Sequence, residues 1–184
     1  DQGCRVLMKG PSSRRKIYVI GNAGGGKTRL SLQLAKIHGV DVTHVDSIQF
    51  RANMQMRPLD ETRRTLSEVA ARDSWLIDGY GPLDQFETRL AQADTVIFID
   101  FPLWRHLWWC AKRQIRALWR PRAELPRGSR EATLAHTRTL MKRVLSAHRK
   151  MRPEVLKFLL REDLKQKLIW IKTMDEWEKV YENG

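Results

Sequence analysis

The sequence predicts an α/β fold in which a five-stranded, parallel and doubly wound sheet is covered by helices on both faces. Short runs of β-branched and aromatic residues alternate along the chain with segments whose apolar residues recur at helical spacing. Such alternation is typical of a parallel sheet with crossover helices. A glycine-rich segment, GNAGGGKT at residues 21–28, follows the first of these runs and precedes the first helix. We therefore expect ligands to bind at the carboxyl edge of the sheet, beside that segment.

The individual elements follow from local patterns. The predicted strands are residues 16–20, 40–45, 75–78, 95–100 and 168–172. Leu30, Leu34 and Ile37 form the apolar stripe of the first helix, which Gly39 ends. The further predicted helices are residues 59–71, 85–91, 103–119, 131–148, 154–160 and 175–181. Residues 1–15 form a polar, basic extension that we expect to be mobile, and residues 16–184 form one domain with a lid-like insert at about 119–130.

Composition narrows the class of protein. Hydrophobic residues make up 42% of the 184-residue chain, so a buried core is expected. No apolar run approaches the roughly 18 residues needed to cross a bilayer. The two cysteines, Cys4 and Cys110, are far apart in the sequence and show no metal-binding spacing. A reducing, cytoplasmic location is therefore the expectation.

The net charge of +13 is concentrated in two segments. Residues 105–130 contain eight Lys or Arg and one acid, and residues 138–152 contain six basic residues and no acid. A field of this kind attracts polyanions, which include nucleotide phosphates, nucleic acid and an anionic membrane. A solvated basic surface is the alternative interpretation.

The glycine-rich segment matches the pattern G-x-x-x-x-G-K-[ST] of a phosphate-binding loop (P-loop). Gly21, Gly26, Lys27 and Thr28 fill the fixed positions. The intervening positions are Asn22, Ala23, Gly24 and Gly25. Backbone N–H groups of such a loop wrap the phosphates, Lys27 adds a positive charge, and Thr28 offers a hydroxyl ligand to Mg²⁺. The motif therefore predicts binding of ATP, or another nucleoside triphosphate, together with Mg²⁺.

Two acids are candidates to hold that Mg²⁺, because two predicted strands end in an aspartate. Asp78 follows Trp75-Leu-Ile, and Asp100 follows Val96-Ile-Phe-Ile. Either strand can neighbour the first one, so strand position alone leaves both open. We favour Asp78 because Gly79 comes next and leaves room for a ligand, whereas Asp100 is followed by Phe-Pro.

Four segments in this order resemble the nucleoside monophosphate kinases, adenylate kinase among them, and more closely the adenylate-kinase-like DNA topology modulation proteins. These segments are the P-loop, residues 44–46 (His-Val-Asp), residues 75–79 (Trp-Leu-Ile-Asp-Gly), and the stretch from Arg89-Leu to Phe-Pro at 101–102. The resemblance implies a P-loop kinase of three α/β/α layers with a short lid. Residues 53–56 depart from the family pattern, in which Trp and Pro-Gly are expected.

The acceptor side of such a kinase needs a group that holds or deprotonates the acceptor. Asp46 leaves the second predicted strand at the carboxyl edge, and the corresponding acid binds the acceptor hydroxyl in the similar shikimate and gluconate kinases. Gly79 leaves space for the acceptor, and Arg51 and Arg89 are candidates to bind an anionic group on it. The alternatives are that Asp46 caps a turn and that both arginines form surface ion pairs.

The long helix predicted at 103–119 carries a basic face formed by Arg105, Lys112, Arg116 and Arg120. An adjoining apolar face is predicted to belong to the core; its members are Trp104, Trp108, Ile115, Leu118 and Trp119. In the kinases that the chain resembles, this helix leads into a lid that closes on the triphosphate. By position, Arg113, Arg116 and Arg122 match the catalytic arginines of that lid, and Arg152 is a further nucleotide-binding candidate.

These patterns favour an ATP-dependent phosphotransferase acting on a small-molecule or nucleotide acceptor. A nucleic-acid-associated NTPase, or a regulator of DNA topology, is the alternative, because the chain is basic and Trp109 lies among basic residues. A nucleotide switch without transfer is a third. No nucleic-acid-binding module is recognised, so we expect nucleic acid to bind weakly and without sequence preference.

Overall fold

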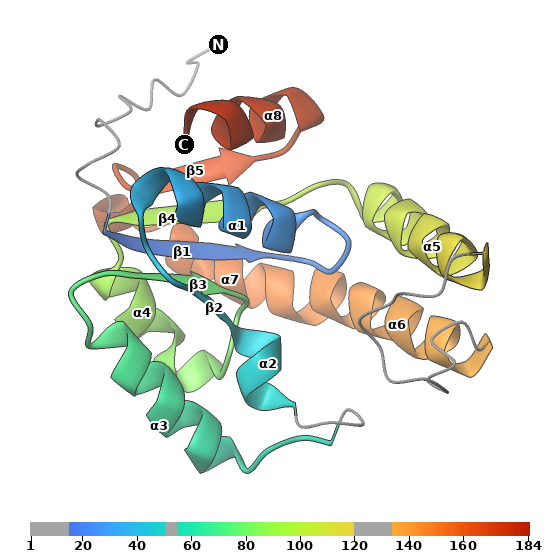
Figure 1. The fold of residues 1–184 in the computed structure, drawn as a ribbon, viewed down its shortest axis with the longest axis horizontal. Coiled ribbons are helices and arrows are strands. Elements are labelled where there is room, and N and C mark those ends of the chain that lie inside the picture. The colour runs from blue at the N-terminus through green and yellow to red at the C-terminus, as the bar shows by residue number, and fades with distance from the viewer. Residues whose placement is uncertain (1–14, 51–54, 120–133) are drawn as a thin grey trace.

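The computed structural model describes residues 15–50, 55–119 and 134–184, and within these ranges it confirms the predicted sheet (Figure 1). The strands are β1 (Lys16–Gly21), β2 (Val42–His44), β3 (Trp75–Asp78), β4 (Thr95–Ile99) and β5 (Leu168–Ile171). They pair in parallel in the order β2-β3-β1-β4-β5. Because β1 lies between β3 and β4, the ends of both of these strands flank the P-loop.

The helices connect and cover these strands. They are α1 (Lys27–His38), α2 (Val45–Gln49), α3 (Leu59–Ala70), α4 (Phe86–Gln92), α5 (Leu103–Trp119), α6 (Leu134–Ser146), α7 (Arg152–Leu159) and α8 (Met174–Asn183). Short 3₁₀ turns lie at Leu83–Gln85 and Glu162–Leu164. The predicted extension lies almost entirely within residues 1–14, which are outside the described residues, as is most of the predicted lid.

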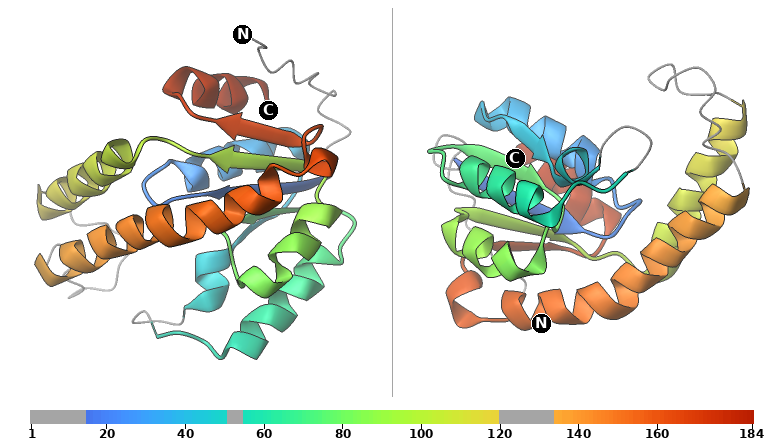
Figure 2. Two further views of the ribbon diagram at one scale, coloured as in Figure 1. Left: turned by 180° about the vertical axis from the view of Figure 1, so that it is seen from behind. Right: turned by 90° about the horizontal axis from the view of Figure 1, so that it is seen from below.

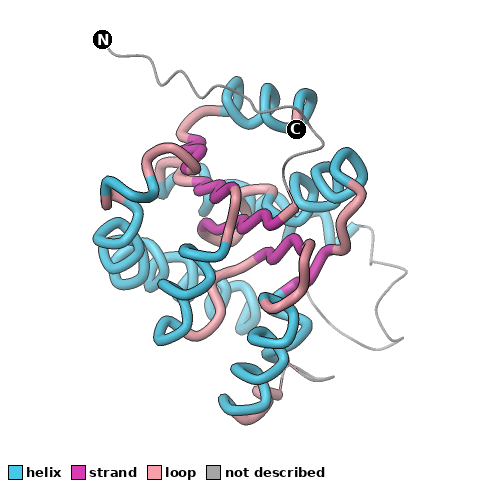
Figure 3. The backbone as a smooth tube through the Cα atoms, turned by 90° about the vertical axis from the view of Figure 1, so that its left-hand side faces the viewer, coloured by secondary structure: helices cyan, strands magenta, loops and turns pink. Residues whose placement is uncertain are grey.

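The sheet separates two apolar cores, which explains the near-continuous hydrophobic runs of its central strands. On one face, α1 and α8 contribute Leu30, Leu34, Trp177 and Val180. On the other face, α3, α4 and α7 contribute residues that include Leu66, Phe86 and Val155. Figure 3 shows the strands in the middle of the molecule with helices around them. The three-layer arrangement predicted from the alternation is thus confirmed.

Two elements differ from the prediction near the carboxyl edge of the sheet. Strand β2 ends at His44, and Val45 and Asp46 already belong to α2, so Asp46 lies in the first turn of a helix and not at a strand end. The helices expected at 131–148 and 154–160 are instead joined by a π-helical turn at Ala147–Met151. Pro153 has no N–H to continue α-helical hydrogen bonding, and the wider turn before it keeps the chain helical.

Helix α5 is oriented differently from the sequence-based expectation. Its residues Trp104, Trp108 and Ile115 were predicted to be core, but their exposed fractions are 64%, 58% and 55%. The buried side is formed instead by His106 and Cys110, which lie against the P-loop. Figure 2 shows α5 and α6 side by side, extending away from the sheet.

Candidate functional site

The P-loop joins β1 to α1 in a conformation that several of its glycines make possible. Gly24 and Gly26 have φ of 77° and 75°, in the left-handed region that side chains other than glycine rarely adopt. Gly26 is the residue before α1, so the loop ends at a free helix N-terminus. The Lys27 ammonium donates to the Asn22 carbonyl at 3.0 Å, which holds its charge over the loop. Backbone N–H groups, helix dipole and ammonium together form a site suited to phosphate.

Two helices outside the motif support the loop. The Asn22 side chain accepts from the Ala23 N–H at 2.8 Å and donates to the Val144 carbonyl of α6 at 3.0 Å. From α5, His106 Nδ1 donates to the Ala23 carbonyl at 2.9 Å. His106 is 1% exposed, and burial lowers the pKa of its imidazole from 6.5 to about 4, so the ring is neutral. The loop is therefore fixed from both sides by α5 and α6.

Asp78 lies beside the loop threonine and has one oxygen without a partner. Its side chain is 5% exposed. Its Oδ2 accepts from Thr28 Oγ1 at 3.3 Å and from His44 Nδ1 at 2.9 Å, whereas Oδ1 is buried and has no hydrogen-bond partner. The hydrogen bond with Asp78 raises the pKa of His44 above 6.5. A buried carboxylate oxygen without a donor needs a cation or water nearby.

Asp100, the other candidate for the metal, is already engaged by protein groups. It accepts from Arg152 Nε at 2.6 Å, from Arg152 Nη2 at 2.8 Å and from Trp170 Nε1 at 3.1 Å. The same ion pair occupies two of the three nitrogens of Arg152. Arg152 therefore binds Asp100 in this structure, and its role toward the nucleotide stays a prediction.

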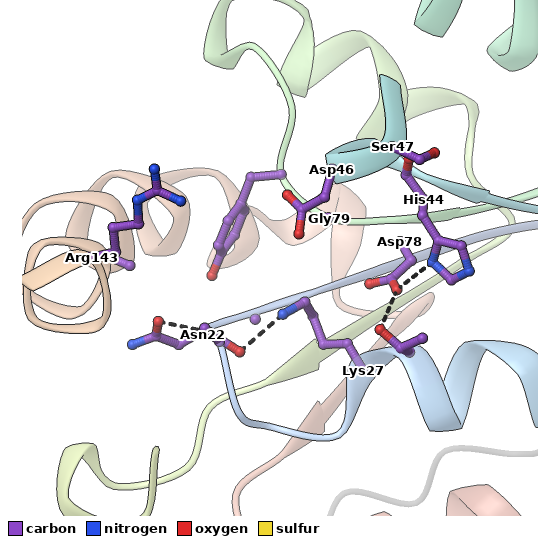
Figure 4. Close-up of a pocket in the computed structure, with 13 residues that line it drawn as sticks. Asn22, Lys27, His44, Asp46, Ser47, Asp78, Gly79 and Arg143 are labelled. Carbon is purple, nitrogen blue, oxygen red and sulfur yellow. Dashed lines mark hydrogen bonds and ion pairs between the residues drawn. The ribbon is translucent and has the colours of Figure 1, made fainter. Parts of the chain in front are cut away.

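A pocket of about 460 Å³ joins the P-loop to the acceptor side (Figure 4). Its lining residues are Gly21, Asn22, Ala23, Lys27, Thr28, His44, Asp46, Ser47, Asp78, Gly79, Tyr80, Arg143 and Ala147. In Figure 4 the carboxylate of Asp46 points from α2 toward Lys27. Arg143, on α6, lies on the other side of the pocket. Acidic and basic groups thus face one cavity above the phosphate site.

Four pocket residues, Ser47, Tyr80, Arg143 and Ala147, were not predicted from the sequence, and the two with large side chains are Tyr80 and Arg143. Arg143 was visible only as one of six basic residues in 138–152, and its place over the pocket depends on how α6 packs. Its guanidinium carbon lies 5.7 Å from the centre of the Phe50 ring. Tyr80 is held by its carbonyl oxygen, which accepts from the Tyr18 hydroxyl at 2.8 Å. Nothing in the local sequence pattern singles out either residue.

Arg89 has a different place from the one predicted. It is 2% exposed and does not line the pocket. Its Nη2 donates to the carbonyls of Tyr80 and Pro82 at 2.7 and 2.8 Å, and its Nε donates to the Tyr18 hydroxyl at 3.2 Å. In this structure Arg89 therefore fixes the loop after β3 that forms one wall of the pocket, and its role toward the acceptor stays a prediction.

Of the remaining predicted site residues, the structure describes Gly79 in full, whereas the side chains of four arginines lie outside its described part. Gly79 lines the pocket, and a side chain there would come within 2.9 Å of Val45 Cβ, so close packing against α2 also requires glycine. Arg113 and Arg116 lie on α5, but their side chains are outside the described part of the structure. Arg51 and Arg122 lie outside the described residues altogether.

No protein-family profile and no curated protein matches the sequence. Solved structures do match. The shikimate kinase of Acinetobacter baumannii, in complex with shikimate, is 18% identical over 93% of this chain and 91% of its own, with a TM-score of 0.52. The shikimate kinase of Bacteroides thetaiotaomicron is 15% identical over 92% of this chain and 95% of its own, with a TM-score of 0.50. The deoxyadenosine kinase of M. mycoides, with bound dATP, is 13% identical over 91% of this chain and 97% of its own, with a TM-score of 0.50.

Identities this low establish the fold alone. The chain has the three-layer P-loop α/β fold found in kinases of the nucleoside monophosphate kinase type. None of the helices among the described residues has both the length and the apolar character needed to span a membrane.

Proposed function

We propose that the protein is an ATP-dependent phosphotransferase that acts on a small-molecule or nucleotide acceptor. The observation that carries the proposal is the single pocket that Lys27 and Thr28 share with Asp46 and Arg143. Direct transfer requires donor and acceptor to be bound in one cavity, which a nucleotide switch does not need. On its sequence motifs alone, we propose that the chain resembles the DNA topology modulation proteins within this fold.

The donor is ATP or another nucleoside triphosphate, held by the P-loop. The N–H groups of residues 22–28 and the N-terminus of α1 bind the phosphates, and Lys27 neutralises charge on the β- and γ-phosphates. The supports from Asn22 and His106 hold the loop in this conformation before the nucleotide arrives. Such preorganisation reduces the cost of ordering the loop on binding.

Thr28 and Asp78 are the residues that would hold Mg²⁺. Both offer oxygen ligands, which Mg²⁺ prefers, and the unpartnered Oδ1 of Asp78 fits a role toward a hydrated cation. When bound, Mg²⁺ neutralises charge on the phosphate oxygens. His44 holds Asp78 Oδ2 and so fixes the direction of the carboxylate.

Asp46 is the proposed general base. The acceptor hydroxyl oxygen attacks the γ-phosphorus, the bond from that phosphorus to the β–γ bridging oxygen breaks, and Asp46 takes the hydroxyl proton. Asp46 is exposed, so its proton can pass to solvent after the reaction. Gly79 has no side chain and so leaves space for the acceptor in the pocket. Arg143 and Arg51 are the candidates to bind an anionic group on the acceptor. The proposed role of Arg113, Arg116 and Arg122 is to bind the transferring phosphoryl group and stabilise its negative charge.

The test is a transfer screen with Mg·ATP and pools of nucleoside monophosphates, nucleosides, sugars and hydroxy acids. At least one pool should raise ADP formation above the rate without acceptor. Lys27→Ala should remove most of this activity and most ATP binding, whereas Lys36→Ala, an exposed lysine on the same helix, should change neither. If Lys27→Ala and Lys36→Ala behave alike, the P-loop does not bind the nucleotide as proposed.

A further inference from the structure

Helix α5 presents a stripe of large apolar side chains to solvent. Trp104, Trp108 and Ile115 are 64%, 58% and 55% exposed. At 100° per residue they fall within about 40° of one another on the helix. Aromatic and aliphatic side chains gathered in this way on a helix surface mark an interaction site more often than chance exposure does.

Positive charge lies directly beside the stripe. Lys112 is exposed and is about 40° from the edge of the stripe on the same helix, and Arg105 lies close to it. The guanidinium of Arg105 is 5.4 Å from the centre of the Trp104 ring. Neither α5 nor the neighbouring α6 contains an acidic residue. The two helices form an arm that extends from the sheet (Figure 2), and we refer to Leu103–Trp119 and Leu134–Ser146 as the basic arm.

We propose that the basic arm docks the protein on an anionic lipid surface. A helix lies in the membrane interface when an exposed apolar stripe with tryptophan is flanked by Lys or Arg. The indole rings of Trp104 and Trp108 would enter the headgroup region, where tryptophan is enriched. Lys112 and Arg105 would remain at the phosphate level, attracted by the negative surface potential.

Charge and geometry favour an anionic membrane over two other partners of the stripe, a second copy of the chain and nucleic acid. A second copy of the chain would bring one acid-free arm against another, and like charges would oppose the contact. Nucleic acid would stack bases on open aromatic faces, but Arg105 lies over one face of Trp104, and Ile115 has no aromatic face to offer. An anionic bilayer accepts both the aliphatic and the aromatic members of the stripe and the charges beside it.

The test is flotation of the full chain with vesicles of phosphatidylcholine alone and of phosphatidylcholine with one quarter phosphatidylglycerol. Binding should require the anionic lipid and should weaken as salt is added. The double variant Trp104→Ser/Trp108→Ser should bind at least about tenfold more weakly because it loses the apolar contact. Lys112→Gln should bind about fivefold more weakly, as expected for one basic residue near an anionic surface.

Two controls make the result specific. Leu32→Ser/Leu160→Ser removes apolar residues of similar exposure outside the arm and should bind as the unmodified chain does. All variants should retain their melting temperature, since the altered side chains are largely exposed. Brominated lipid should quench the tryptophan fluorescence of the unmodified chain, and it should quench the Trp104→Ser/Trp108→Ser variant much less.

Several outcomes would overturn the proposal. Failure to bind anionic vesicles would do so, as would equal losses in the Trp104→Ser/Trp108→Ser and Leu32→Ser/Leu160→Ser variants. A concentration-dependent dimer, or binding of single-stranded DNA, that depends on Trp104 and Trp108 would assign the stripe to a second copy or to nucleic acid. A shift in tryptophan emission on adding Mg·ATP without lipid, lost in the Trp104→Ser/Trp108→Ser variant, would show that the chain covers its own stripe.

Discussion

Acidification should destabilise the fold through His106, the buried histidine under the P-loop. Its pKa is about 4 in the folded chain, against 6.5 for an ordinary histidine, because burial disfavours the charged ring. Between these two values the unfolded chain binds a proton that the folded chain does not. Stability must therefore fall as the pH decreases from about 6.5, and the loss is complete below about pH 4.

The size of the effect follows from the shift. At about 1.36 kcal/mol per pKa unit, the complete loss is about 3 kcal/mol. At about pH 5.5 the loss is about 1.4 kcal/mol, because at that pH the unfolded histidine is mostly protonated and the folded one is not. This intermediate figure changes little if the folded pKa is somewhat higher, so about pH 5.5 is the better place to measure.

The assay is urea unfolding of the unmodified chain and of His106→Asn at neutral pH and at about pH 5.5. The asparagine amide can still donate to the Ala23 carbonyl but does not titrate. His44 acts in the opposite direction, because its pKa is raised by Asp78: the stability it contributes is present below about pH 6.5 and is lost as the pH rises through its folded pKa.

The comparison between the two proteins removes the contribution of His44 and of every other group they share. The unmodified chain should lose about 1.4 kcal/mol more than His106→Asn on acidification. An equal loss in both proteins would show that His106 is not held neutral under the P-loop, and the account of how α5 supports the loop would be wrong.

Three further predictions follow from the site. Asp78→Asn should lower Mg²⁺-dependent turnover strongly with little effect on melting, whereas Asp100→Asn should mainly lower the melting temperature because Arg152 loses its carboxylate partner; the reverse order would reassign the metal. Alanine at Arg113, Arg116 or Arg122 should lower kcat by about ten- to a thousandfold and alter the KM for ATP less, and normal turnover in all three variants would remove the lid from the mechanism. Duplex DNA should bind weakly, without sequence preference and with steep salt dependence, so tight selective binding at physiological salt would favour a regulator.

The P-loop and the sheet could be predicted because their signals are local. Glycines with left-handed φ, a lysine and a threonine at fixed spacing determine the loop wherever a strand precedes it and a helix follows. The boundary after β2 was less predictable. Strand β2 is only three residues long, and the sequence does not show that the chain turns into α2 one residue before Asp46. Asp46 nevertheless lines the pocket, as expected of an acid at this edge.

The orientation of α5 could not be predicted from its sequence. A helical projection shows which residues share a face, but it does not show which face meets the protein. The tryptophan stripe resembles a core face, yet α5 buries His106 and Cys110 against the P-loop, so closely that a side chain at Gly24 would lie 3.0 Å from Cys110 Sγ. That contact exists only once the loop is folded.

The roles of the arginines depended on long-range packing in the same way. Arg89, Arg143 and Arg152 are equally basic in the sequence, but the structure buries the first against backbone carbonyls, places the second on the pocket and pairs the third with Asp100. Residue type identifies a group that can bind an anion. Whether it meets an acid, a carbonyl or a ligand is decided by helices that are distant in the sequence.

The fate of a radiolabelled γ-phosphate shows whether phosphoryl transfer takes place in the pocket above the P-loop. With Mg·ATP and an acceptor from the active pool, the label should appear in the acceptor, and Asp46→Asn should reduce this transfer much more than it reduces ATP binding. Ser47→Ala, at the adjacent pocket residue, is the matched control and should change transfer far less. If the label appears only as inorganic phosphate with every acceptor, or if Asp46→Asn transfers normally, the pocket above the P-loop is not the site of phosphoryl transfer.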